Sequence, residues 1–138
     1  MDRDIEIMAK TIYGEARGEY RLPNGGLDSL IAIGNVIMNR AKRSGESVVT
    51  ECLKPYQFSC WNKNDPNRRV IENVRPSDAI YEKCFTIAGK LLCGDLQTDA
   101  TNGATHYYSV RMRSPPYWSV NKQPVAVIGN HIFFNLSY

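Results

Sequence analysis

The chain has 138 residues, 43% of them hydrophobic, which indicates a single domain over residues 1–138 and leaves no room for a second one. The net charge of +3 and the pI near 8.7 are only mildly basic, so charge alone identifies no class of partner. The first residues are acidic, and no apolar run reaches the length of a signal peptide or a membrane span. We therefore expect a protein that is cytoplasmic as synthesised and does not insert into a membrane.

The first predicted helix covers residues 3–17 and ends near Gly18. Its apolar residues recur at helical spacing and define a core face. On the same helical wheel Glu15 lies roughly 75° from the middle of that face, and Glu19 lies roughly 35° from it. Both carboxylates thus point toward buried surface, where carboxylates rarely lie without a partner or a task.

A turn-forming stretch over residues 20–26 predicts an exposed loop, and a second helix follows from Leu27 to beyond Ala41. This helix is apolar on most sides, and Gly34 on its packed face indicates the close approach of another helix. Cations at Arg40, Lys42 and Arg43 favour the dipole of its last turn, and Gly45 ends it.

The middle of the chain alternates short helices with polar loops. Ser47 is the predicted cap of a short helix that ends before Pro55, and residues 62–76 are predicted mostly as loop. Ser77 is the predicted cap of a third long helix, which Gly94 closes.

The last third favours strands. Residues 104–110 are rich in strand-forming side chains, whereas 113–118 contain two prolines and are irregular. Residues 125–128 and 131–134 flank a Gly-Asn pair that is typical of a two-residue hairpin turn. The fold class is therefore α+β, mainly helical with a small antiparallel β-sheet in the C-terminal third.

The four cysteines lack the C-x-x-C spacing of a structural zinc site. Cys84 and Cys93 on one helix would lie about 13 Å apart, beyond the ~7 Å limit for a disulfide. A bridge between Cys52 and Cys60 is geometrically feasible, but the absence of a signal peptide favours reduced thiols. We expect four free cysteines.

Glu15 is the first candidate for chemistry. A carboxyl group half-buried against apolar side chains disfavours its charged form, and a general acid needs the protonated form. The structural alternative is a boundary glutamate bonded to Arg17 or to a loop. Glu19 could complete a two-carboxylate glycosidase site, but Gly18 should break the helical register. A structural pairing of Glu19 with Arg17 or Arg40 is an equal alternative.

Aromatic residues outside the helix faces form a second candidate group. They suit a sugar-binding cleft, although nucleic-acid stacking would use the same types and many could simply cover the core: Tyr56, Phe58, Trp61, Tyr107, Tyr108, Tyr117 and Trp118. The only histidines, His106 and His131, could pair with Cys60 or bind zinc, but both lie in predicted strands, where structural roles are commoner. Ser59 could orient a water or a substrate group.

Five motifs, in order and over nearly the whole chain, resemble the cell-wall hydrolase family of spore cortex-lytic enzymes and related phage or prophage lysins. They are residues 12–19 (IYGEARGE), 33–40 (IGNVIMNR), 57–61 (QFSCW), 103–108 (GATHYY), and Trp118 followed by 128–133 (IGNHIF).

The resemblance implies a compact lysozyme-like domain that cleaves peptidoglycan glycan strands between N-acetylmuramic acid and N-acetylglucosamine, as a lytic transglycosylase or a muramidase. It implies that Glu15 is the catalytic acid, supported by Glu19 and Arg17. Ser59, Gln57 and Tyr107 would line the cleft near Glu15, and Trp61 and Trp118 are candidate sugar platforms. The other supporting or substrate-binding candidates are Tyr13, Phe58, His106 and Tyr108. We expect no metal or other cofactor, and a monomer that binds peptidoglycan glycan strands and no nucleic acid.

Two stretches depart from the family pattern. The link at Leu22–Gly26 and the polar segment 61–76 are longer than expected, and the latter could grip substrate. Neither a signal peptide nor a wall-binding module is recognisable, which favours a lysin that reaches the wall by another route. Two alternatives stay open: a metal-dependent amidase using His106 and His131, and a non-catalytic module that binds wall or nucleic acid.

Overall fold

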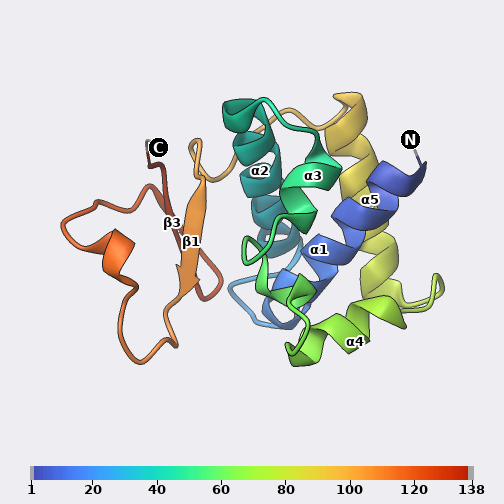
Figure 1. Cartoon of the computed structure of the whole chain (residues 1–138), viewed down its shortest axis with the longest axis horizontal. Coiled ribbons are helices and arrows are strands. Elements are labelled where there is room, and N and C mark those ends of the chain that lie inside the picture. Colours follow the sequence, from blue (N-terminus) through green and yellow to red (C-terminus); the bar gives the residue numbers. More distant parts are fainter. Residues whose placement is uncertain (1, 137–138) are drawn as a thin grey trace.

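The computed structural model describes residues 2–136. Five α-helices form one layer, and a three-stranded sheet lies beside it (Figure 1). In chain order the elements are α1 (Asp2–Tyr20), α2 (Leu27–Ser44), α3 (Val48–Leu53), the 3₁₀ turn η1 (Ser59–Trp61), α4 (Pro66–Glu72), α5 (Ala79–Cys93), β1 (His106–Ser109), the 3₁₀ turn η2 (Tyr117–Ser119), β2 (Ala126–Ile128) and β3 (His131–Phe134). This α+β architecture confirms the predicted fold class.

Helix α1 is the centre of the helical layer and contacts α2, α3, α4 and α5. Met8, Ile12 and Ala16 are buried on the predicted core face. The predicted end near Gly18 is wrong, because the helix continues to Tyr20. A glycine inside a helix costs up to about 1 kcal/mol, but Glu19 is held by a tertiary hydrogen bond beyond it and keeps the last turn helical.

Helix α2 agrees with its prediction at both ends. Gly45 adopts φ 76° and donates its N–H to the carbonyl of Ala41, as expected for a left-handed C-cap. A methyl group added at Gly34 would lie 2.4 Å from Cδ1 of Leu91, so α5 approaches this position closely. Both features were readable from local sequence.

The short helices illustrate capping. Ser47 caps α3 as predicted, its side chain accepting from the N–H of Thr50. Helix α4 lies in the stretch predicted mostly as loop; Asp65 caps it and Pro66 is its first residue, a favourable pair at a helix start. The predicted cap of α5 is also wrong by one residue, because Asp78 rather than Ser77 accepts from the first N–H groups.

The sheet has the order β1-β3-β2, and both pairings are antiparallel. Gly129 and Asn130 form the predicted two-residue turn between β2 and β3. Because side chains alternate across a strand, the register gives the sheet two different faces. Tyr107 and its partner Phe133 point toward the helices, whereas His106, Tyr108 and Phe134 share the other face.

All four cysteines are free thiols. Burial raises the pKa values of Cys52 and Cys84 to about 12 and also raises that of Cys60, whereas Cys93 is exposed. Over residues 2–136, no helix is both long enough and apolar enough to cross a membrane.

Candidate functional site

Glu15 lies near the C-terminal end of α1, where η1 and β1 converge on it. Its Oε2 atom accepts hydrogen bonds from the backbone N–H of Cys60 (3.0 Å) and the hydroxyl of Ser59 (3.4 Å). Its Oε1 atom accepts from the hydroxyl of Tyr107. Three donors from two different elements therefore fix the orientation of this half-buried carboxyl group.

Tyr107 reaches Glu15 from the inner face of β1. Burial, followed by the neighbouring charge and hydrogen bond of Glu15, raises the pKa of the Tyr107 hydroxyl well above its usual value. The hydroxyl therefore keeps its proton at neutral pH and acts as a donor. Its ring is supported by His131, with centroids 4.9 Å apart, and by Phe133 at 5.7 Å.

Glu19 lies one turn further along α1 and is bound to the hairpin turn instead. Its Oε2 atom accepts from the N–H of Asn130 (2.9 Å), and its Oε1 atom lies 4.0 Å from Nε2 of His131. Burial lowers the pKa of His131 despite the opposing effect of Glu19, so the imidazole is neutral at neutral pH. The predicted pairing of Glu19 with Arg17 or Arg40 is wrong.

An open hollow of about 340 Å³ lies beside Glu15. It is lined by Gly14, Glu15, Arg17, Gly18, Glu19, Arg21 and Asn67. Arg17 donates to Oδ1 of Asn67 (2.8 Å), and its guanidinium carbon lies 5.4 Å from the ring centroid of Tyr13. The Tyr13 hydroxyl in turn donates to Asp78 (3.0 Å). Arg17 and Tyr13 thus connect α1 to α4 and to the start of α5.

Three predicted site residues of the 57–61 motif face away from Glu15. Gln57 contacts Arg40 and Glu51. Phe58 is 1% exposed and belongs to the core, so its aromatic ring cannot line a substrate cleft. Trp61 is half-buried and donates its indole N–H to Thr11 on α1 (2.9 Å). From this motif, Ser59 and the backbone of Cys60 reach the carboxyl group.

Three further predicted site residues, His106, Tyr108 and Trp118, gather on the outer face of the sheet, whereas Tyr56 and Tyr117 are exposed. Trp118 packs against His106, Tyr108 and Phe134, with ring centroids 5.1, 5.9 and 5.4 Å away. Burial, with added repulsion from Arg40 and Arg43, lowers the pKa of His106 to about 4. These residues lie on the face opposite to Tyr107 and therefore form a group separate from Glu15.

The two histidines of the amidase hypothesis do not meet. His106 pairs with Phe134 in the register, whereas His131 pairs with Ser109 at the other end of the same ladder. Among residues 2–136, no group of three His, Cys, Asp or Glu side chains is arranged to hold a metal ion. The described histidines therefore give no support to a metal-dependent site.

Residue type alone could not reveal two features near the site, a backbone donor to Glu15 and the burial of Arg40. The N–H of Cys60 is a backbone group, so residue type cannot reveal it. Arg40 was expected as a cation in the last turn of α2, but it is only 7% exposed and bonds to Gln57 and Thr105. Its neighbours are 17 and 65 residues away and exist only in the folded chain.

Comparison with known proteins identifies the family. No curated protein sequence matches the chain. Two solved structures are similar in fold: the catalytic domain of the SleB protein of Bacillus cereus, and the catalytic domain of the germination-specific lytic transglycosylase SleB from Bacillus anthracis. Each is 23% identical and matches 97% of this chain; the TM-scores are 0.66 and 0.67, and 91% and 95% of the other chains are covered.

The sequence profile of the Cell Wall Hydrolase family matches residues 26–134. This stretch covers most of the chain and includes Ser59, Cys60 and Tyr107, but it begins after the helix that carries Glu15. The chain therefore belongs to the cell wall hydrolase family.

Proposed function

We propose that this cell wall hydrolase cleaves the glycan strand of peptidoglycan between N-acetylmuramic acid and N-acetylglucosamine, with Glu15 as its single general acid and base. In this proposal the reaction is that of a lytic transglycosylase. The product carries a 1,6-anhydro ring on the muramyl residue.

The observation that carries the proposal is the unequal environment of two carboxylates on one helix. Glu15 borders the hollow and is oriented by Ser59, Cys60 and Tyr107. Glu19 borders the same hollow, but one of its oxygens accepts from the N–H of Asn130. A two-carboxylate glycosidase places its groups on either side of the scissile bond. Two glutamates on successive turns of α1 belong to one wall of the hollow, which favours a mechanism with one carboxyl group.

The proposed chemistry needs one carboxyl group and no activated water. The protonated carboxyl of Glu15 gives its proton to the glycosidic oxygen as the bond from that oxygen to C1 of the muramyl residue breaks. The resulting carboxylate then accepts the proton of the muramyl C6 hydroxyl, whose oxygen forms the new bond to C1. The proton count is balanced, and Glu15 ends in its starting state.

The named relative from Bacillus anthracis is consistent with this proposal, since it is described as a lytic transglycosylase. At 23% identity the likeness itself concerns the fold. The transfer of the activity to this chain rests on the residues around Glu15.

The test is mass spectrometry of muropeptides released from purified peptidoglycan. Wild-type protein should release fragments lighter by one water than hydrolytic products, with ends that borohydride does not reduce. Glu15→Gln should release nothing while keeping the wild-type circular dichroism spectrum. Glu19→Gln is the matched control, because its amide oxygen can still accept from Asn130, and it should retain activity.

Three results would contradict the proposal in different ways. Release by Glu15→Gln would exclude Glu15 as the acid. Reducible muramyl ends of full mass would indicate a muramidase. Free N-terminal alanine without new glycan ends would indicate an amidase.

A further inference from the structure

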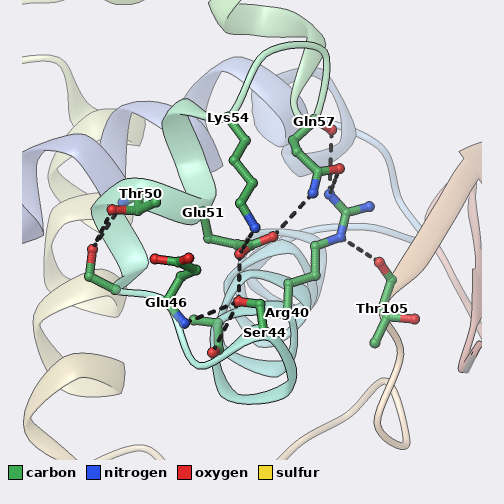
Figure 2. A network of polar contacts seen from close by, with 10 residues as sticks. Arg40, Ser44, Glu46, Thr50, Glu51, Lys54, Gln57 and Thr105 are labelled. Atoms are coloured by element: carbon green, nitrogen blue, oxygen red, sulfur yellow. Dashed lines mark hydrogen bonds and ion pairs between the residues drawn. The ribbon is translucent and has the colours of Figure 1, made fainter. Parts of the chain in front are cut away.

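Arg40 is a buried cation that holds two distant segments together. Its Nε atom donates to the carbonyl of Thr105 at 2.6 Å. One terminal nitrogen lies 3.4 Å from the carbonyl oxygen and 3.3 Å from the side-chain oxygen of Gln57. The guanidinium carbon lies 4.8 Å from the ring centroid of Phe58. Figure 2 shows the guanidinium with Gln57 on one side and Thr105 on the other.

Each segment held by Arg40 leads within a few residues to a donor for Glu15. Thr105 comes two residues before Tyr107, whose hydroxyl binds Oε1 of the glutamate. Gln57 comes two and three residues before Ser59 and Cys60, which both bind Oε2. Arg40 does not contact Glu15 itself. It holds the two segments whose donors bind the two oxygens of the Glu15 carboxyl group.

The far side of Gln57 is fixed as well. Its amide nitrogen donates to Glu51 at 3.1 Å, and Glu51 is only 2% exposed (Figure 2). The hydroxyl of Ser44 and the ammonium of Lys54 bind the other carboxylate oxygen at 2.9 and 3.0 Å. Gln57 is therefore a neutral bridge between a buried cation on α2 and a buried carboxylate on α3.

Burying the Arg40 guanidinium without a direct counter-ion within residues 2–136 costs folding free energy, which a purely structural role would not require. Among the described residues, no carboxylate lies within ion-pair distance of Arg40. A buried charge that lacks a direct counter-ion costs stability, and apolar residues often replace such groups without loss. Such departures from an apolar interior are typical of functional sites.

We propose that Arg40 is a positioning residue for catalysis: its forked guanidinium sets the spacing between the Ser59–Cys60 segment and β1, and thereby the orientation of the Glu15 carboxyl group. The inference rests on the proposed role of Glu15. A lysine at this position keeps the charge but cannot donate in two fixed directions at once. The geometry of the fork, rather than its charge, is the property that the site requires.

The test compares Arg40→Lys with Arg43→Lys, using soluble peptide-substituted glycan oligomers as substrate. Arg43 lies on the same helix and also donates to two acceptors, Asn135 and Leu136, which follow β3. Leu136 bonds to the side-chain hydroxyl of Thr105, whereas Arg40 holds the backbone carbonyl of Thr105, and neither acceptor of Arg43 contacts Glu15. Arg40→Lys should lower kcat by about 10- to 100-fold, because misplacement of a catalytic group by about 1 Å has effects of this size. KM should be unchanged, and Arg43→Lys should keep the wild-type kcat.

A double-mutant comparison separates positioning from general loss of structure. Tyr107→Phe removes one of the donors that Arg40 positions, so the fall in kcat from Arg40→Lys should be smaller in the Tyr107→Phe background. The proposal would be overturned if the two substitutions lowered kcat by independent factors, so that the double variant showed their product. A wild-type kcat in folded Arg40→Lys would overturn it as well.

If Arg40→Lys does not fold, Gln57→Met serves as the second variant, since it removes the side-chain acceptor from a less buried position. A wild-type kcat in folded Gln57→Met would then overturn the proposal, whereas a reduced kcat with unchanged KM supports it. Glu15→Gln is assayed in parallel: its activity would refute the role of Glu15 itself, which is a different result from failure of the Arg40 comparison.

Discussion

Substituting Gly14 by alanine should damage the site through a single methyl group. The new Cβ would lie 2.6 Å from Cβ of Cys60, 2.9 Å from its Sγ atom and 2.9 Å from Cγ2 of Ile71. Carbon atoms in contact prefer about 3.5–4.0 Å, so η1 must move away from α1 by roughly 1 Å. A shift of that size stretches the 3.0 Å bond from Cys60 N–H to Glu15 beyond hydrogen-bonding range.

The expected change in the free energy of unfolding of Gly14→Ala is the sum of opposing contributions. Alanine in place of glycine inside a helix gains up to about 1 kcal/mol. Overpacking costs about 1–3 kcal/mol, and losing a buried hydrogen bond costs about 1 kcal/mol more. Gly14→Ala should therefore lower the free energy of unfolding by about 1–3 kcal/mol. Activity should fall by about 100-fold, because the acid loses a fixed donor through a shift of about 1 Å.

Gly89→Ala provides the matched control. Gly89 lies inside α5, and a Cβ there would find its nearest neighbour, Cδ1 of Ile5, at an ordinary 3.9 Å. This variant should gain up to about 1 kcal/mol and keep full activity. Urea unfolding followed by circular dichroism measures the stability of both variants, and muropeptide release measures activity. The reasoning is refuted if Gly14→Ala is as stable and as active as Gly89→Ala.

Three further predictions concern pH, thiols and capping. The pKa of His106 is about 4 in the folded protein and about 6.5 in the unfolded chain. The unfolded chain therefore binds more protons between these pH values, and the free energy of unfolding should fall as the pH drops from 6.5 toward 4. His106→Gln should reduce this dependence of the free energy of unfolding on pH, as measured by urea unfolding. Iodoacetamide at pH 8 should add one group to the native protein, at exposed Cys93, and four groups after denaturation, as measured by intact mass. Burial raises the pKa values of Cys52 and Cys84 to about 12, so rapid labelling of either thiol in the native protein would contradict the structure. Asp78→Ala should cost about 0.5–2 kcal/mol because the cap of α5 is lost, whereas Asp78→Asn should restore most of it in thermal unfolding.

Features that depend on neighbours in sequence were predictable. The Gly-Asn hairpin turn, the Ser47 cap and the Gly45 helix end each follow from a residue type at a fixed position. The missed helix α4 also had such a signal in Asp65 and Pro66, but the polar residues around it concealed the helical pattern. Local physical chemistry therefore accounts for most of the element boundaries.

Features that depend on distant contacts were not predictable in the same way. The wheel placed Glu15 toward buried surface, but its donors lie 45 and 92 residues away at Cys60 and Tyr107. The end of α1 was misplaced because the bond from Asn130 to Glu19 spans 111 residues and outweighs the local effect of Gly18. Arg40 could not be recognised as buried because Thr105, its closest acceptor, lies 65 residues further along the chain.

Two hydrogen bonds that join α1 to the sheet can form only late in the synthesis of the chain, because the partners of α1 lie near the C-terminal end of the protein. Glu15 binds Tyr107 on β1, and Glu19 binds the turn at Asn130, so both partners belong to the last third of the protein. A ribosome completes all five helices before it reaches either partner. A nascent chain that ends after α5 therefore carries its proposed acid without the tyrosine that orients it. Glu15 therefore gains its Tyr107 donor only after β1 has been made, and Glu19 gains its Asn130 donor only after β2.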